Sequence, residues 1–262
     1  MNQTKIEWCD VTWNPVTGCK HGCPYCYAKN VAHRFGGWTS GDVTIHQNYG
    51  KTPAVLDSPM LIQRGNGKTY PAPYPFDFEP TFHRYRLDEP EKMETPKTIF
   101  VCSMADLFGK WVPTEWIVSV LDACKRAPQH RYLFLTKNPS RYLELEHLAL
   151  LPRGDNFWYG STVTKPDDEA LWVKDIDCHW FVSLEPLHEG IDLSKGNIKE
   201  LPEWVIVGAE TGNRQGKIVP EMEWLRKIAE DCASFDIPLF MKDSLDGLWG
   251  GTLIRQFPWQ FQ

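Results

Sequence analysis

At 262 residues with 42% hydrophobic content, the chain is long enough to bury one large core, and we expect a single domain over 1–262. Its formal net charge of -6 argues against a protein that coats nucleic acid regardless of sequence, because such binding rests on phosphate neutralisation by Lys and Arg. The sequence has no apolar run near 18 residues and no signal-peptide pattern after Met1, so we expect no membrane association and a location in the reducing cytoplasm.

Three closely spaced cysteines form the first motif in chain order. Cys19, Cys23 and Cys26 have the spacing C-x3-C-x2-C. Four thiolates usually hold a [4Fe-4S] cluster, so three cysteines without an obvious fourth leave one iron free to take an outside ligand. Because an open metal position usually indicates chemistry rather than scaffolding, the motif predicts a catalytic cluster.

Zinc and disulfide bonds are the alternative uses of these cysteines. Residues 23–26 alone have the form of half a zinc knuckle, but such a site needs a second ligand pair, and no second C-x-x-C or H-x3-H follows. A disulfide framework fits poorly because the chain is too long to need one. The remaining cysteines are also scattered singly, at Cys9, Cys102, Cys124, Cys178 and Cys232.

The chain changes character after the cysteines. Residues 27–35 are expected to form a short helix that ends at Gly36 and Gly37. Residues 38–96 are rich in Gly, Pro and aromatic side chains, and we expect an irregular but ordered cap or insertion. Its aromatic residues are candidates for base stacking or for local packing, and its basic residues are candidates for a local nucleic-acid-binding patch or for ordinary solvated surface. These residues are Trp38, Tyr49, Tyr70 and Tyr74, and Arg64, Lys68, His83, Arg84 and Arg86.

From residue 97 onward, apolar strand patterns alternate with amphipathic helix patterns, as in parallel βα units. Bulky residues in these patterns, Trp116, Trp158, Trp180 and Trp204, are expected in the core. The expected strands are 98–102, 132–135, 157–163, 180–184, 204–207 and 239–241, and the expected helices start at a capping Thr114, start near Pro139 and span 221–235.

These elements predict an α/β fold, a complete or partial (β/α) barrel of about six to seven parallel strands with right-handed crossovers. Active sites in such barrels lie at the carboxyl ends of the strands. Polar residues are frequent at the predicted strand ends, where they serve either an active site or ordinary caps and turns. They are Cys102, Ser103, Asp106, Thr136, Lys137, Asn138, Ser161, Thr162, Glu185, Glu210 and Lys242.

The cysteine spacing, together with Tyr25 just before the last cysteine, resembles the signature of the radical S-adenosylmethionine (SAM) superfamily. The resemblance implies a radical SAM-type barrel in which the open iron chelates the amino and carboxylate groups of SAM. It also implies an external one-electron donor such as flavodoxin or ferredoxin, and cleavage of SAM to methionine and a 5'-deoxyadenosyl radical that abstracts hydrogen from a substrate. The cofactor supplies this chemistry, and the protein positions and shields it.

Longer runs resemble a phage-associated family of three-cysteine proteins without an assigned substrate. Members of that family often have a longer gap between the first two cysteines and an Asn at the position of Cys102, so this chain departs from the family pattern at both places. The runs are distributed along nearly the whole chain, at 4–8, 12–19, 103–108, 135–139, 183–187 and 204–210.

A more distant resemblance is to spore photoproduct lyase, a radical SAM enzyme that repairs a thymine dimer in DNA. A cysteine loop that ends Cys-Tyr, a Ser-x-x-Asp strand end and a Thr-Lys strand end occur in the same order in both. By this similarity Ser103 and Lys137 hold the amino and carboxylate ends of SAM, which suits a hydroxyl and a point charge. Tyr25 contacts the adenine, and Ser161 or Thr162 reaches the ribose.

The remaining candidates each have two interpretations. Asp106 belongs to the same strand end as Ser103 and is placed in the SAM site, while Glu185 and Glu210 bind ribose hydroxyls or substrate. Cys102 returns a hydrogen atom to a substrate radical, as a cysteine near this place does in the lyase, or is a small buried hydrophobe, as most free cysteines are. His21 tunes the cluster through a hydrogen bond or, as we expect, faces solvent from the loop.

Together these features predict a radical SAM enzyme of lyase or modification type that binds a [4Fe-4S] cluster and SAM. Relatedness to a DNA repair lyase favours a nucleobase, nucleotide or nucleic acid as substrate, whereas the acidic charge favours a small molecule or peptide. The competing class is a non-enzymatic module in which zinc or an iron-sulfur group staples a binding loop.

Overall fold

The computed structural model describes residues 1–36, 54–63, 68–170, 178–195 and 201–260. Within these ranges, the main sheet contains eight strands, and all but the first run parallel to one another. Their order across the sheet is β1 (Asn2–Gln3), β2 (Val11–Trp13), β8 (Thr98–Val101), β9 (Arg131–Thr136), β10 (Phe157–Thr162), β11 (His179–Leu184), β12 (Val205–Val207) and β13 (Leu239–Met241).

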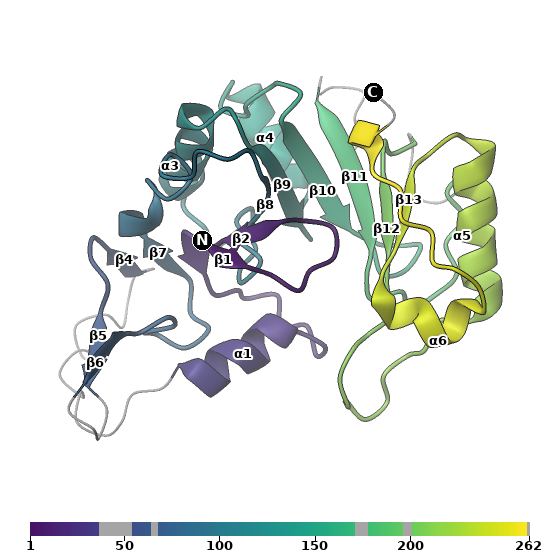
Figure 1. The fold of residues 1–262 in the computed structure, drawn as a ribbon, viewed down its shortest axis with the longest axis horizontal. Coiled ribbons are helices and arrows are strands. Elements are labelled where there is room, and N and C mark those ends of the chain that lie inside the picture. Colours follow the sequence, from purple (N-terminus) through teal and green to yellow (C-terminus); the bar gives the residue numbers. More distant parts are fainter. Residues whose placement is uncertain (37–53, 64–67, 171–177, 196–200, 261–262) are drawn as a thin grey trace.

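The sheet curls into a half-barrel (Figure 1). This confirms the predicted α/β class and, of the two predicted forms, the partial barrel. All the parallel strands except β2, for which no range was predicted, lie within one or two residues of their predicted positions, because each is a short, largely buried apolar run, which is a strong local signal.

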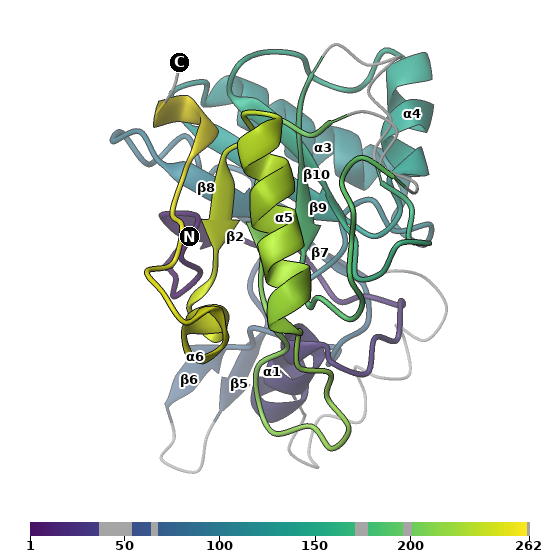
Figure 2. The same cartoon turned by 90° about the vertical axis from the view of Figure 1, so that its right-hand side faces the viewer.

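Helices cover the outer face of the half-barrel. They are α3 (Thr114–Arg126), α4 (Ser140–His147) and α5 (Met222–Ser234), and α5 lies across the sheet in Figure 2. The predicted capping role of Thr114 is wrong, because Pro113 occupies the cap position and Thr114 is the first helical residue. Shorter helices follow β13, namely η3 (Asp243–Leu245), α6 (Asp246–Trp249) and η4 (Pro258–Gln260).

The first helix, α1 (Tyr27–Phe35), has its predicted bounds and lies on the side of the sheet to which the carboxyl ends of β10 and β11 point (Figure 1). The described part of the predicted insertion contains short strands and one helical turn. They are β4 (Ala54–Leu56), β5 (Leu61–Gln63), β6 (Thr69–Pro71), β7 (Thr81–His83) and η1 (Arg84–Arg86), and β7 also pairs with β3 (Val16–Thr17). None of the helices in the described ranges has the length and apolar character that a membrane span requires.

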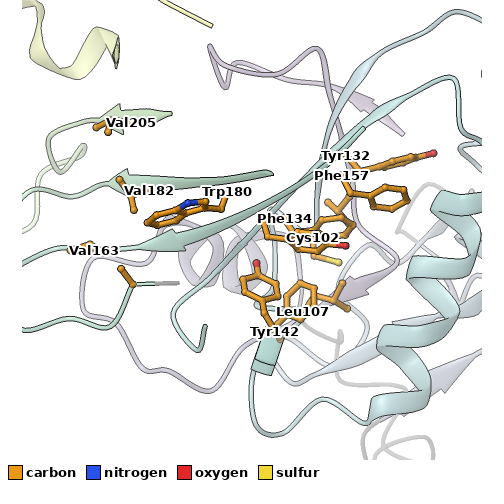
Figure 3. Packing of buried hydrophobic residues seen from close by; sticks show 14 of the residues in the cluster. Cys102, Leu107, Tyr132, Phe134, Tyr142, Phe157, Val163, Trp180, Val182 and Val205 are labelled. Atoms are coloured by element: carbon orange, nitrogen blue, oxygen red, sulfur yellow. The ribbon is translucent and has the colours of Figure 1, made fainter. Parts of the chain in front are cut away.

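Two apolar layers hold the half-barrel together. The outer layer packs the helices on the sheet, and Figure 3 shows Tyr132, Phe134, Phe157 and Trp180 within it. The inner layer fills the curl of the sheet with one bulky residue from each of several strands, because residues two apart in a strand share a face. Its members are Trp8, Phe100, Leu133, Trp158, Phe181, Trp204, Ile206 and Phe240.

The inner layer closes one end of the half-barrel. The ring of Trp8 lies 4.6 Å from that of Phe100 and 6.4 Å from those of Phe181 and Trp204. A Cβ atom on Gly160 would lie 2.4 Å from the ring of Phe181, so only glycine allows this ring to cross β10. Side chains therefore fill the lumen at the amino ends of the strands, and a cavity remains at their carboxyl ends.

Candidate active site

A cavity of about 730 Å³ lies at the carboxyl ends of the parallel strands. Its volume falls within the range of small-molecule sites, and its position is the one that barrel enzymes use. The structure brings to it all the predicted site residues except Cys102, Ser161 and the strand-end candidate Asn138, which is buried and bonded to Phe108 and Ser140. Those lining the cavity are Cys19, Cys23, Tyr25, Cys26, Ser103, Asp106, Lys137, Thr162, Glu185 and Glu210.

The cysteine loop is attached to the end of β8 through backbone contacts. Gly18 donates its N–H to the carbonyl of Met104 at 2.9 Å, and Cys19 donates to the carbonyl of Phe78 at 3.1 Å. Gly18 has a φ of +89°, and a Cβ atom there would lie 2.3 Å from the carbonyl oxygen of Glu79. Glycine is thus required for the loop to enter the cavity between β8 and the insertion.

The loop ends by starting α1. The Sγ atom of Cys26 accepts a hydrogen bond from the backbone N–H of Lys29 at 3.4 Å, so Cys26 serves as the N-cap of the helix. Burial raises the pKa of the Cys26 thiol, while the amides of the first helical turn act in the opposite direction. Burial also raises the pKa of Cys19, to about 12.

Three thiols on one loop fit the cluster chemistry that their spacing predicts. Among the described residues, no group of three or more His, Cys, Asp or Glu side chains converges on a position for a single metal ion. A cluster makes a different demand, because its cysteines bind separate irons. Since both Cys19 and Cys26 are held as thiols by burial, loading of metal would release protons from the loop.

Asp106 connects the cysteine loop to two strand ends. Its Oδ1 accepts from the backbone N–H of Phe108 at 3.0 Å and from the hydroxyl of Thr136 at 2.7 Å. Its Oδ2 lies 2.7 Å from Nε2 of His21 and accepts from the backbone N–H of Lys137 at 3.0 Å. Four contacts occupy both oxygens, so Asp106 positions the site rather than offering a free carboxylate to SAM.

We expected His21 to face solvent, and this prediction was wrong. Its ring bonds to Asp106 and packs edge-on against Trp111, with centroids 4.8 Å apart. The sequence contains no local sign of this contact because the two bonded residues are 85 positions apart.

Ser103 is held at the cavity by a neighbour that the sequence did not reveal. Asn14 Oδ1 accepts from the Ser103 hydroxyl at 3.2 Å and from the backbone N–H of Met104 at 2.9 Å. The hydroxyl of Tyr27 donates to the Ser103 carbonyl at 2.8 Å. Asn14 and Tyr27 thereby fix the turn after β8 from the two sides of the cysteine loop.

Lys137 and Tyr25 face each other across the cavity wall. The Nζ atom of Lys137 lies 5.5 Å from the centre of the Tyr25 ring, within the range of a cation–π contact. Burial lowers the pKa of Lys137, and the nearby Cys23 and Asp168 act in the opposite direction. No anion neutralises the ammonium at hydrogen-bond distance in the described part of the chain, so a bound carboxylate would complete its environment.

Of the two candidates for the ribose, Thr162 lines the cavity and Ser161 is buried. The alternation of side chains along β10 places Gly160 and Thr162 on the inner face and turns Ser161 outward. The alternation of side chains therefore places Thr162, and not Ser161, in the cavity. The sequence alone had left this choice open.

Glu185 and Lys242 form a charge pair on the far side of the sheet from β8. Lys242 Nζ donates to Glu185 Oε1 at 2.5 Å and lies 3.7 Å from Oε2 of Glu7. Glu7 is fixed in turn, because its Oε1 accepts from the backbone N–H of Asp243 at 2.9 Å. A Cβ atom on Gly208 would meet both partners of the pair at 3.1 and 3.2 Å, so glycine leaves room for it.

Glu210 lies in the cavity wall but is already paired. Arg214 donates from Nε and a terminal nitrogen to its two oxygens, each at 2.6 Å, and holds the pKa of Glu210 below its usual range. His188 Nε2 lies 4.0 Å from Glu210 Oε2 and has no hydrogen-bond partner among the described residues. The ring of His188 packs edge-on against that of Tyr25 in the cavity wall, with centroids 5.1 Å apart.

Cys102 occupies the outer apolar layer instead of the cavity. It is 2% exposed, and Figure 3 shows its sulfur near Leu107 and Phe134. Phe100 faces the lumen, so a continued strand would turn Cys102 inward as well. The strand ends at Val101, however, and Cys102 adopts a φ of +60°, which turns its side chain away. The surroundings of Cys102 are thus those of a small buried hydrophobic residue. Burial raises the pKa of its thiol to about 12.

His83, Arg84 and Arg86, which were candidates for a basic patch or for ordinary surface charge, do not form a free basic patch in the described part of the insertion. His83 is fully buried and bonds to the hydroxyl of Thr17 at 2.9 Å, and burial together with Arg86 lowers its pKa to about 3, so the ring is neutral. Arg84 pairs with Asp57 at 2.8 Å, and Arg86 donates to a main-chain carbonyl at 2.8 Å.

The remaining insertion candidates divide differently. Lys68 and Tyr70 are exposed, whereas Tyr74 lines the cavity beside Phe78. The described part of the insertion thus contributes aromatic walls to the cavity. Outside the described residues lie Trp38, Tyr49 and Arg64.

His83 makes stability depend on pH. We expect the free energy of unfolding to fall below pH 6.5, because the unfolded chain binds a proton there that the folded chain does not bind until about pH 3. Between about pH 7.5 and about pH 5.5 this group alone removes about 1.4 kcal/mol. Urea denaturation of the wild type and His83→Gln at both pH values measures the difference. Equal losses in the two proteins would show that His83 is not the titrating group.

The sequence missed three residues that shape the cavity. Asn14, Glu7 and Arg214 act on partners far along the chain or on a loop, and none belongs to a motif of its own. A weak signal existed for two of them, because Glu7 and Asn14 lie within the runs at 4–8 and 12–19.

Comparison with known proteins places the chain in a family but does not assign an activity. A family model described as a protein of unknown function (DUF5131) matches residues 3–255, nearly the whole chain. No curated protein and no solved structure matches it.

Proposed function

The chain belongs to this family of unknown function, DUF5131, and from that premise we propose that it is a radical SAM enzyme that acts on a small substrate bound in the half-barrel. One observation carries the proposal. The three cysteines of the C-x3-C-x2-C loop line the same cavity as the polar side chains at the ends of six parallel strands, β8 to β13.

The donor set suits the group that the spacing implies. A [4Fe-4S] cluster would be held at the N-terminus of α1 by Cys19, Cys23 and Cys26. When bound, such a cluster supplies the electron that cleaves SAM to methionine and a 5'-deoxyadenosyl radical. The buried aromatic layer on the amino side of the half-barrel would shield that side of the cavity from water.

The chain's own residues supply the binding groups for SAM. Lys137 would neutralise its carboxylate, and the Ser103 hydroxyl, fixed by Asn14, and carbonyl, fixed by Tyr27, would take its ammonium. Tyr25 offers an aromatic face for the adenine beside Lys137, and Thr162 a hydroxyl for the ribose.

The cavity also limits the substrate. Its volume of about 730 Å³ suits small molecules. Of the basic candidates for a nucleic-acid patch, His83 is neutral, Arg84 is paired with Asp57 and Arg86 donates to a main-chain carbonyl, while Lys68 is exposed. A free nucleobase or nucleoside fits these constraints better than a polymer. Such a substrate would contact charged side chains that line the cavity, namely Glu7, Glu185 and Lys242.

Anaerobic reconstitution tests the proposal. The protein is loaded with iron and sulfide, SAM and dithionite are added, and 5'-deoxyadenosine is measured by mass spectrometry. We expect a brown protein with charge-transfer absorbance and formation of 5'-deoxyadenosine. A colourless, folded protein that retains zinc would instead favour the non-enzymatic module, in which the cysteines staple a loop.

Lys137→Ala is expected to weaken SAM binding by roughly ten- to a hundredfold, because a hydrogen bond to a charged group contributes about 1.5–3 kcal/mol. Iron content should stay unchanged, since Lys137 is not a ligand. Calorimetric titration of the reconstituted protein with SAM, together with iron analysis, measures both. Lys125→Ala is the matched control, because Lys125 is exposed on α3 and pairs with the exposed Asp122. Loss of iron in Lys137→Ala would contradict the assignment.

A further inference from the structure

The Glu185–Lys242 pair is the part of the cavity that SAM binding does not explain. It lies at the ends of β11 and β13, whereas the cysteine loop is bound to the ends of β8 and β9 through Gly18 and Asp106. The order of the sheet separates these strands, so the pair and the loop approach the cavity from different parts of the curl. A molecule bound between them would touch both.

The pair is half-buried and only partly satisfied. The side chains of Glu185 and Lys242 are 25% and 15% exposed. Lys242 uses one proton on Glu185 Oε1, and Glu7 at 3.7 Å is too far for a hydrogen bond. Glu185 Oε2 has no hydrogen-bond partner within the described ranges. The pair therefore presents an unused acceptor beside an unused donor.

This combination recognises a particular kind of edge. A carboxylate only accepts and an ammonium only donates, so the ligand must offer a donor directly beside an acceptor. A lactam has its N–H and its carbonyl on the same edge, as uracil and guanine do. A trans peptide group does not match, because its N–H and C=O point in opposite directions.

The floor of the cavity favours a flat ring next to the pair. Trp8, Phe100 and Leu135 line it, and the first two rings are 4.6 Å apart. Stacking of a base on an aromatic side chain contributes about 1–3 kcal/mol.

We propose that Glu185 and Lys242 recognise the lactam edge of a nucleobase, free or as a nucleoside, with the N–H donating to Glu185 and the carbonyl accepting from Lys242. This inference rests on the proposed function for the reaction that follows binding, but the recognition itself needs neither cluster nor SAM. Glu7 is a positioning residue. Its carboxylate, which is fixed by the backbone N–H of Asp243, attracts the Lys242 ammonium from the N-terminal segment.

Binding is measured by calorimetry on the full chain with uridine and guanosine, against 3-methyluridine and 1-methylguanosine, which lack the N–H of the same edge. We expect the methylated probes to bind about ten- to a hundredfold more weakly, as expected when one hydrogen bond of a matched pair is lost. Glu185→Gln should lower the affinity for the unmethylated probes by a similar factor. Glu144→Gln, the same change in an exposed carboxylate that pairs with Arg141 on α4, should leave it unchanged.

The outcomes separate this inference from the proposed function, because 5'-deoxyadenosine formation is measured on the same preparation. Binding that depends on the N–H and on Glu185 supports the lactam site even if SAM is not cleaved. Cleavage of SAM without binding of any probe overturns the site and leaves the enzyme class standing. Equal binding of methylated and unmethylated probes, or binding of the diamine cadaverine in place of uridine, also overturns it. Thermal unfolding of each variant shows whether it is folded. The methylated probes test recognition on the wild-type protein, where no folding defect arises.

Discussion

Cys26→Ala is expected to lose the bound iron and to reduce 5'-deoxyadenosine formation by roughly a hundredfold or more, to the background without enzyme. Loss of a residue that only orients a metal ligand already lowers metal affinity or activity by about 10–100-fold, and Cys26 is proposed as a ligand itself. Iron content and mass spectrometry of the anaerobic reaction measure the two effects.

Cys26→Ser separates ligation from helix capping. Serine is a good N-cap and keeps the acceptor for the Lys29 N–H, so α1 should remain intact, but it offers no thiolate. We expect Cys26→Ser to melt like the wild-type apoprotein and still to lack iron and activity. Cys178→Ala changes a cysteine outside the loop and should keep both. Iron and activity in the serine variant would mean that Cys26 only caps the helix.

Asp106→Asn is expected to lower the free energy of unfolding by about 3 kcal/mol and the melting temperature by roughly 5–10 °C. An amide replaces one acceptor oxygen with a donor, and all four partners of Asp106 act as donors toward it. The change therefore places N–H groups against each other in a buried network that connects the cysteine loop to β9.

Urea and thermal denaturation of the apoprotein measure this effect without any cofactor. Asp122→Asn is the matched control, because Asp122 is exposed and pairs with the exposed Lys125, and we expect a change within about 0.5 kcal/mol. SAM binding should also weaken in Asp106→Asn, since the backbone of Lys137 loses its anchor. An Asp106→Asn protein that melts like the wild type would show that the four contacts do not act as a buried network.

The prediction of the fold succeeded where the signals were local. The strands are short runs of apolar residues between turn signals, and α1 ends at Gly36 as expected, so boundaries were accurate to a few residues. The parallel half-barrel followed from the alternation of these elements, because parallel strands need helical crossovers. The extent of closure did not follow, since it depends on how the inner layer around Trp8 and Phe181 packs.

The corrections concern contacts between distant segments. His83 was predicted as a surface charge, but β7 pairs with β3 and buries it against Thr17, 66 residues earlier. His21 was expected in solvent and instead bonds to Asp106. Cys102 has the expected place in the sequence, yet a positive φ at the end of β8 turns its side chain into the outer layer.

The sequence by itself determined the cysteine loop, the order of strands and helices, and the strand ends that carry polar groups, because each depends on spacing within a few residues. Only the tertiary structure decided which of these groups share a cavity, that Thr162 and not Ser161 faces it, and that Asp106 is already saturated. It also paired Glu185 with Lys242, 57 residues apart, and brought Glu7 to the backbone of Asp243, 236 residues away. Such contacts arise from the curl of the sheet, and no local pattern of residues encodes them.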